Sequence, residues 1–190
     1  MRHEAPEGNI LPGDEIYLLG SVGVFGTREI VRRGEDALRY LYPPSFVDRM
    51  RFLDEKDPEE LLSRMDYRGL FPLGEGGLLS GLWDFLFASQ VGFCGEDLSL
   101  VPIHQETIEA CETFGLNPYA LHSKGAFLVS MENGRRAESL AREEGFSFRY
   151  LGYATAQKKR TLGNHERQVF LTPSVKEELF KMPGEVRDER

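Results

Sequence analysis

Positive charge and cysteine are both scarce in this sequence of 190 residues. Its 23 Lys and Arg are outnumbered by 31 Asp and Glu, which gives a formal net charge of −8. Because nucleic-acid binders gain most of their affinity from clustered Lys and Arg, this balance argues against DNA or RNA as a partner. The one sustained basic run, Lys158-Lys159-Arg160, lies beside a predicted turn and is typical of a solvated strand end.

The two cysteines, Cys94 and Cys111, are too far apart for a CxxC pair and have no histidine nearby at metal-ligand spacing. We therefore expect two buried thiols and no bound metal. Long apolar runs are also missing: none reaches the roughly 18 residues typical of a membrane span, and no cationic, apolar leader opens the chain. These absences predict a cytoplasmic protein with no membrane partner.

Glycine, in contrast, is abundant, and its most specific arrangement is the turn Gly74-Glu75-Gly76-Gly77 ahead of an apolar run over 78–87. Glycine lets the backbone approach a ligand closely, and the first turn of a helix offers unpaired N–H groups and a partial positive charge to an anion. The sequence thus predicts a phosphate-facing turn followed by a buried helix over 76–90. A tight strand-to-helix turn that only permits close packing is an equal alternative.

A second glycine loop, Gly23-Val24-Phe25-Gly26-Thr27, follows a predicted buried strand over 15–20. Thr27 is expected to cap a short helix over 28–33, which the next glycine ends. Gly23, Gly26 and Thr27 are candidate ligand contacts by the same anion-site argument. The phenylalanine between the two glycines could instead fill a hydrophobic surface.

The segment Ser123-Lys124-Gly125 precedes a predicted strand over 126–131 and adds a cation that could face the same cleft. All three of its residues are candidate ligand contacts, although a loop lysine is more often simply solvated. His104 and His122 titrate near neutral pH. Neither has an evident carboxylate partner in the sequence, so we expect capping or surface roles for them rather than catalysis.

Strands alternate with helices through most of the chain, which predicts an α+β fold: a mixed β-sheet with helices packed on it. The expected organisation is a mobile N-terminal arm over 1–9, a single domain over 10–181 and a frayed tail over 182–190. Gly163-Asn164 is expected to turn a hairpin, and a last short helix is expected over 173–181.

Several short motifs follow one another in a specific order: Pro12-Gly13-Asp14, the loop with Gly23, Gly26 and Thr27, Glu75-Gly76-Gly77 before a helix, Gly115-Leu116-Asn117-Pro118, Ser123-Lys124-Gly125 before a strand, and Tyr150-Leu151-Gly152-Tyr153-Ala154-Thr155. This order resembles the C-terminal half of the aminoimidazole ribonucleotide (AIR) synthase superfamily, the PurM-like proteins, over about residues 10 to 181. The stretch 105–112, followed by Asn117-Pro118-Tyr119, is similar to the AIR synthase-related branch near the hydrogenase maturation dehydratase.

In that superfamily a two-domain protein binds ATP and Mg²⁺ chiefly through acidic residues of its N-terminal half, and the C-terminal half contributes a glycine loop. The acidic motifs have no counterpart in this sequence. Members also commonly place a His-Asp or Asp-Val-Thr element before the paired glycines, where this chain has Leu70-Phe71-Pro72-Leu73-Gly74 and leaves Glu75 as the one acid of the loop. Since phosphoryl transfer needs cations and oriented charges, this departure argues against such chemistry by the chain alone.

The resemblance therefore implies a free-standing domain that is not an enzyme as an isolated chain and that binds a phosphate-bearing small ligand or a partner subunit. ATP or phosphate is the implied ligand, and the implied partner is a protein supplying the N-terminal half, or a second copy in a homodimer. Two alternatives stay open. One is an ATP-dependent enzyme of the hydrogenase-maturation type, active with a separate N-terminal half and using Glu75 and Lys124; the other is an interaction protein whose glycine turns serve packing.

Overall fold

The computed structural model describes residues 7–163, 168–173 and 175–182. In these residues a mixed sheet has the strand order β1-β3-β5-β2-β6-β4-β7-β8. Neighbouring strands run antiparallel except for the parallel pair β4 and β7. The strands are β1 (Glu7–Gly8), β2 (Glu15–Leu19), β3 (Gly69–Pro72), β4 (Gly92–Gly95), β5 (Phe127–Met131), β6 (Phe148–Thr155), β7 (Arg160–Gly163) and β8 (Gln168–Phe170).

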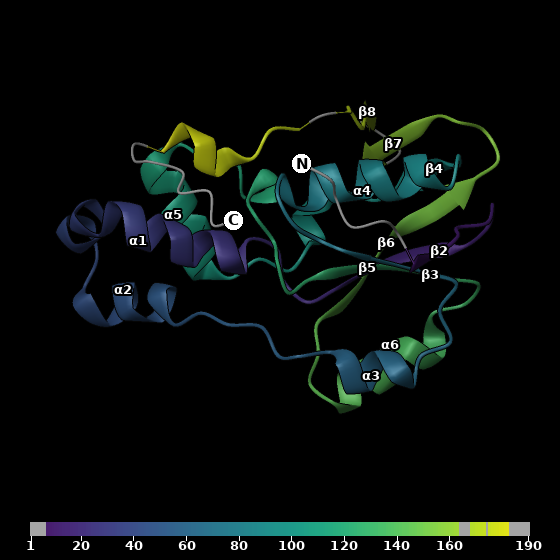
Figure 1. Cartoon of the computed structure of the whole chain (residues 1–190), viewed down its shortest axis with the longest axis horizontal. Helices are drawn as coiled ribbons and strands as arrows, with labels where there is room; N and C mark the ends of the chain where they lie inside the picture. The colour runs from purple at the N-terminus through teal and green to yellow at the C-terminus, as the bar shows by residue number, and fades with distance from the viewer. Residues whose placement is uncertain (1–6, 164–167, 174, 183–190) are drawn as a thin grey trace.

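The helices surround this sheet in three groups (Figure 1). Helix α4 covers one face, α3 and α6 cover the other, and α1, α2 and α5 pack together beside the sheet. The predicted α+β fold is therefore confirmed. The helices are α1 (Val24–Leu41), α2 (Pro44–Arg51), α3 (Glu59–Ser63), α4 (Gly77–Ala88), α5 (Gln105–Phe114) and α6 (Arg135–Glu143), with short 3-10 helices η1 (Leu98–Leu100), η2 (Pro118–Ala120) and η3 (Glu178–Lys181).

Strand β2 lies at the centre of the sheet, between β5 and β6. Its side chains alternate between two hydrophobic cores: Ile16 and Leu18 face the core beneath α4, whereas Tyr17 and Leu19 face the core beneath α3 and α6. All four are at most 3% exposed, and burying each aliphatic side chain contributes about 1.5–3 kcal/mol. Burial on both faces explains the nearly continuous apolar run that predicted this strand.

Helix α4 is largely buried, as its apolar composition predicted, but Phe87 and Ala88 at its C-terminal end are exposed. An arginine binds a carbonyl group at this end. Arg160 was expected in solvent but is 9% exposed. Its guanidinium donates to Val91 O at 3.0 Å and Leu86 O at 3.3 Å, and it lies 4.7 Å from the centre of the Trp83 ring. The cation satisfies carbonyl groups at the negative end of the helix dipole, so the basic run is not a simple solvated strand end.

Helix α1 differs from its prediction at both ends. It begins four residues earlier than expected, with Gly23 as the N-cap at φ 79° and ψ 8°. Thr27 therefore lies inside the helix, where its hydroxyl donates to Gly23 O at 2.8 Å instead of capping. Gly34 does not end the helix: it bends the chain at φ −133°, and helical residues continue to Leu41.

The predicted last helix is also wrong for most of its length. Of residues 173–181, the 3-10 helix η3 contains Glu178–Lys181, and Glu177 before it is extended at ψ 126°. The reason is long-range: the Glu177 carboxylate binds backbone N–H groups of other elements, described below, which holds this segment away from a helical path.

Both chain ends fall partly outside the described residues. Residues 1–6 of the predicted arm and 183–190 of the predicted tail lie outside them, as does the predicted turn residue Asn164. Glu7 and Gly8, expected in the arm, form β1 and pair with Leu70 and Gly69 of β3. Strands β7 and β8 pair antiparallel on the two sides of the predicted hairpin turn. The division into arm, domain and tail stays a prediction.

Cys94 and Cys111 are both unbonded, but they differ in burial. Cys111 is buried as expected, and desolvation raises the pKa of its thiol to about 12. Cys94 is partly exposed, contrary to expectation, because it lines a surface hollow together with Tyr150 and Tyr153. Within the described ranges, no helix is both long enough and apolar enough to cross a membrane.

Candidate functional site

Ser123 joins the three predicted ligand-binding segments. Its backbone N–H donates to Gly74 O at 3.1 Å, and its hydroxyl oxygen accepts from the Gly23 N–H at 2.9 Å. The same hydroxyl donates to Leu121 O at 2.7 Å, and the side chain is fully buried. The fold thus brings the loops at 23–27, 74–77 and 123–125 together, although they are far apart in the sequence.

The first loop packs closely against neighbouring segments. The Gly26 N–H donates to His122 O at 2.9 Å, and the Thr27 hydroxyl contacts the Thr107 hydroxyl at 2.7 Å. A Cβ on Gly26 would lie 2.3 Å from Leu121, and one on Gly23 would lie 2.8 Å from Thr107. Gly23, Gly26 and Thr27 are all buried, so their geometry favours the packing alternative at this loop.

The N-terminus of α4 holds a carboxylate from the chain itself. Gly76, at φ 71°, donates its N–H to Glu177 Oε2 at 2.8 Å. The other oxygen, Oε1, accepts from the backbone N–H groups of His122 at 3.2 Å and Leu179 at 3.1 Å. Glu177 is 5% exposed; desolvation raises its pKa, and the three N–H donors oppose that rise. The donor expected to face phosphate therefore has an intramolecular anionic partner.

Four of the predicted residues form an accessible edge. Gly74, Glu75 and Gly125 are partly exposed, and Lys124 is exposed. A Cβ on Gly74 would meet no atom within 4 Å, whereas one on Gly77 would lie 2.5 Å from Leu121 O. These four residues are accessible to solvent, whereas Gly76, Gly77 and Ser123 are buried.

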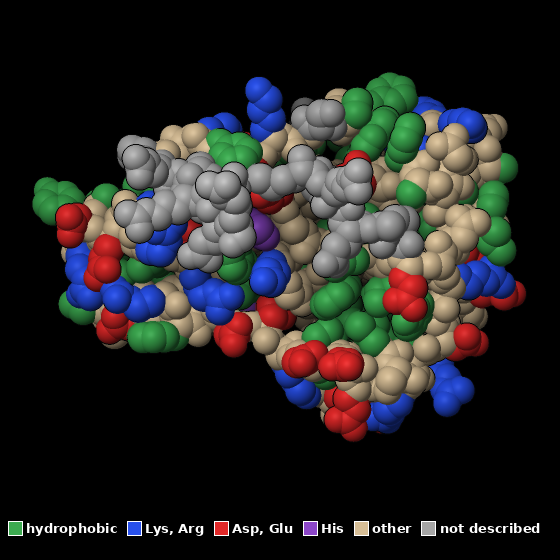
Figure 2. All heavy atoms as spheres, in the orientation of Figure 1, with side chains coloured by type: hydrophobic (Ala, Val, Ile, Leu, Met, Phe, Trp, Pro, Cys, Tyr) green, Lys and Arg blue, Asp and Glu red, His purple; other side chains and the backbone are tan. Residues whose placement is uncertain are grey.

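An aromatic pair flanked by cations borders the edge. The Phe25 ring lies 4.4 Å from the His122 ring, centre to centre, with Lys124 Nζ at 6.0 Å and the Arg28 guanidinium at 5.7 Å from Phe25. Burial, and then the nearby Lys124 charge, lowers the pKa of His122 to about 4, so the imidazole is neutral at pH 7. Figure 2 shows basic and acidic side chains interspersed over α1 and α2, so the charge there is not of one sign.

His104 has the carboxylate partner that the sequence did not reveal. Its Nε2 lies 3.8 Å from Glu55 Oε1, an oxygen that also accepts from the Ser21 N–H at 3.0 Å. The Glu55 carboxylate raises the pKa of His104. His104 is the N-cap residue of α5, but its side chain makes no capping hydrogen bond. Glu55 thus links the α2–α3 connection to the start of α5 through His104 and to the loop after β2 through Ser21.

Neither Glu177 nor Glu55 was identified from the sequence. Glu177 stands in a segment that resembles a helix, and Glu55 stands in an irregular connection, so no local pattern marks either residue. Their partners Gly76 and Ser21 are 101 and 34 residues away. Within the described residues, no group of three or more His, Cys, Asp or Glu is placed to hold a metal ion.

Known proteins with a similar sequence or structure were found for this chain. No protein-family model matches the sequence. The sequence is 27% identical over 158 residues to the carbamoyl dehydratase HypE of Rhodobacter capsulatus, which covers 81% of this chain and 45% of that protein. The chain thus spans about half the length of this curated relative.

Solved structures of HypE and of a thiamine-monophosphate kinase share the fold of this chain. HypE of E. coli superimposes with a TM-score of 0.68 at 18% identity, covering 90% of this chain and 52% of that one. A hydrogenase maturation protein HypE in complex with ATP gives 0.60 at 18% identity, covering 87% and 52%. Thiamine-monophosphate kinase from Stenotrophomonas maltophilia K279a gives 0.62 at 16% identity, covering 82% and 51%.

Proposed function

We propose that this chain works as one half of a two-part site. The proposal starts from its homology to HypE and from its AIR synthase-related fold. In this proposal it is not catalytic alone. It contributes a phosphate-facing edge, made by Gly74, Glu75, Lys124 and Gly125, to a cleft that a nucleotide-binding partner completes. We also propose that the protein acts in the cytoplasm.

One observation carries the proposal: Ser123 ties the three glycine-containing segments into one preformed wall, and Lys124 remains exposed beside it. A rigid wall with an exposed cation suits an anionic group, because little ordering is needed on binding. The wall alone is poorly equipped for phosphoryl transfer, since Glu75 is the one acid among its four accessible residues. The match covers 45% of HypE, so the groups in the rest of that protein have no counterpart among the matched residues.

The partner in this proposal carries the ATP- and metal-binding half, on a separate protein or on further residues of the same polypeptide. One related structure holds ATP, and another is a complex of HypE with HypF, so both nucleotide and protein partners occur among the relatives. A homodimer is the other assembly that we propose to test. The alternative function is an ATP-dependent enzyme that is active with a separate N-terminal half. It needs the same partner, but it also requires Glu75 and Lys124 to take part in the chemistry.

Calorimetric titration of the purified chain separates these functions. We expect inorganic phosphate and ATP to bind weakly and with the same affinity in the presence and absence of Mg²⁺. Binding of ATP that requires Mg²⁺, followed by hydrolysis, would favour the enzyme. No saturable heat with either probe would contradict the phosphate-facing edge and favour an interaction protein.

A matched pair of lysine variants locates the binding. Lys124→Gln removes the cation beside the edge and is expected to weaken phosphate binding by about two- to fivefold, because one exposed charge contact contributes about 0.2–1 kcal/mol. Lys158→Gln is the control, because Lys158 lies at the sheet, where it contacts Gln90. Equal losses for the two variants would point to a non-specific charge effect.

A further inference from the structure

A second hollow lies at the opposite end of β5 from the glycine-containing loops. It has a volume of about 470 Å³ and is formed by the residues after α3, the residues at the end of β5 and the first turns of α6. Residues 123–125 precede β5, whereas residues 131–133 of the hollow stand at its far end and just beyond. The hollow is therefore separate from the candidate site, and its function does not depend on the one proposed above.

The floor of the hollow is apolar. Met65, Met131 and Ala137 line it and are each at most 8% exposed, and Leu140 adds a partly buried wall. Methionine side chains are flexible and polarizable, so such a floor adapts to apolar groups of different shape. An apolar floor with a few polar groups at the rim is typical of a small-molecule site.

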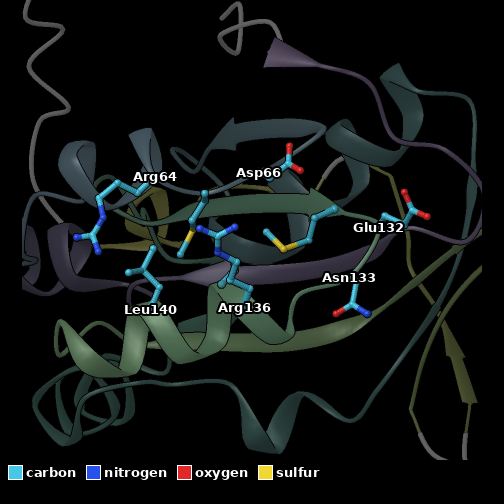
Figure 3. A pocket seen from close by; sticks show the side chains of 9 residues that line it. Arg64, Asp66, Glu132, Asn133, Arg136 and Leu140 are labelled. Carbon is cyan, nitrogen blue, oxygen red and sulfur yellow. The ribbon is translucent and has the colours of Figure 1, made fainter.

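Two charges at the rim are not compensated by ion pairs within the described ranges. Arg64 pairs with Glu144, and the carboxylate of Glu132 pairs with Arg68. Arg136 and Asp66 form no ion pair with another described residue. Figure 3 shows the Arg136 side chain rising from α6 beside Leu140, with Asp66 across the hollow.

Asn133 adds a hydrogen-bond donor on the side of Arg136. Its Oδ1 accepts from the Arg135 N–H at 3.1 Å, which leaves the amide NH₂ group as the part that can serve a ligand. A guanidinium and an amide N–H suit a carboxylate, whereas the Asp66 carboxylate suits an ammonium group. The two rim charges thus have opposite signs and lie on opposite sides of an apolar floor.

We propose that this hollow binds a small zwitterion with an apolar body, of the chemical class of apolar amino acids and dipeptides. The carboxylate of the ligand contacts Arg136 and Asn133, and its ammonium group contacts Asp66. Its apolar side chain covers Met65 and Met131. An adjoining shallower hollow, which shares Arg136 and Leu140, gives room for a second side chain.

Three probes with the same two apolar side chains test the proposal by calorimetry: leucyl-leucine, N-acetyl-leucyl-leucine without the ammonium group, and leucyl-leucinamide without the carboxylate. We expect leucyl-leucine to bind at least about tenfold more tightly than either other probe, the effect of one lost charge contact. Equal affinity for the three, or no saturable binding of leucyl-leucine, would overturn the proposal.

Single substitutions then assign each charge. Arg136→Gln should weaken the binding of leucyl-leucine by about tenfold and leave that of leucyl-leucinamide unchanged. Asp66→Asn should weaken the binding of leucyl-leucine and leave that of N-acetyl-leucyl-leucine unchanged. Arg135→Gln is the matched control, because this neighbouring arginine of α6 is exposed and does not line the hollow. The same loss in Arg135→Gln as in Arg136→Gln would refute the assigned contact.

Discussion

Glu177 Oε2 accepts a 2.8 Å hydrogen bond from the backbone N–H of Gly76, at the N-terminus of α4. The same carboxylate accepts from His122 and Leu179 through its other oxygen. One buried side chain therefore joins three parts of the fold and places a negative charge at the positive end of a helix. In this chain the helix terminus expected to face a ligand also holds the C-terminal segment in place.

Glu177→Gln is expected to lower the free energy of unfolding by about 1–3 kcal/mol, the cost of leaving a buried donor unsatisfied. A glutamine keeps one acceptor oxygen but turns an NH₂ group toward at least one backbone N–H donor. Urea denaturation at pH 7 measures the change, and hydrogen exchange of the Gly76 amide reports whether α4 has lost its partner.

The control is Glu178→Gln, because Glu178 is also buried but contacts Asn117 and Lys181 rather than α4. We expect its substitution to leave exchange at Gly76 unchanged. Faster exchange at Gly76 in both variants, or in neither, would contradict the specific role given to Glu177.

Neighbouring glycines of the same turn should respond differently to alanine. Gly74→Ala is expected to change stability by less than about 0.5 kcal/mol, since its Cβ meets no atom within 4 Å. Gly77→Ala is expected to cost more than about 1 kcal/mol, because at φ 58° the new Cβ would lie 2.5 Å from Leu121 O. Thermal unfolding compares the two, and equal melting temperatures would show that the turn is not packed as described.

Ser123→Ala is expected to destabilise the fold by about 1–3 kcal/mol, because it leaves the buried Gly23 N–H without its acceptor. Ser139→Ala is a suitable control: the Ser139 hydroxyl donates to Arg135 O on an exposed surface of α6, so its removal should have little effect. Chemical denaturation measures both, and a small effect of Ser123→Ala would show that the three loops are held together by other contacts.

Sequence patterns predicted helices and strands well where the apolar composition of the segment itself determined the structure. The strand predicted over 15–20 is found over Glu15–Leu19, and the helix predicted over 76–90 is found over Gly77–Ala88. Both are predominantly apolar, and burial leaves such segments few alternatives.

The predictions were poorer where distant residues decided the structure. Glycine can begin a helix or end one, and at α1 the packing of Gly23 on Thr107 and Leu121 determined the start. Glu177 belongs to a locally helical pattern, but N–H groups of Gly76 and His122, far away in the sequence, bind its carboxylate, and its backbone is not helical. The loops of the candidate site were identified, yet the hydroxyl of Ser123 as their common partner required the fold.

The two histidines near the loops should give opposite dependences of stability on pH. The pKa of His122 is lowered to about 4 in the folded protein, so between about 6.5 and 4 the unfolded chain binds more protons and stability falls as the pH falls. The loss in the free energy of unfolding is at most about 3 kcal/mol, because each unit of difference between the folded and unfolded pKa corresponds to about 1.4 kcal/mol. The Lys124 charge strengthens the effect and Glu29 opposes it.

His122→Phe keeps the ring against Phe25 and removes the titration, so its unfolding free energy should fall less than that of the natural chain between pH 6.5 and 4. His104→Phe should act in the reverse sense. The pKa of His104 is raised by Glu55, so its contribution is present below about pH 6.5 and is lost as the pH rises through the folded-state value. Urea titrations at several pH values measure both differences, and parallel curves for the natural chain and His122→Phe would contradict a neutral, buried His122.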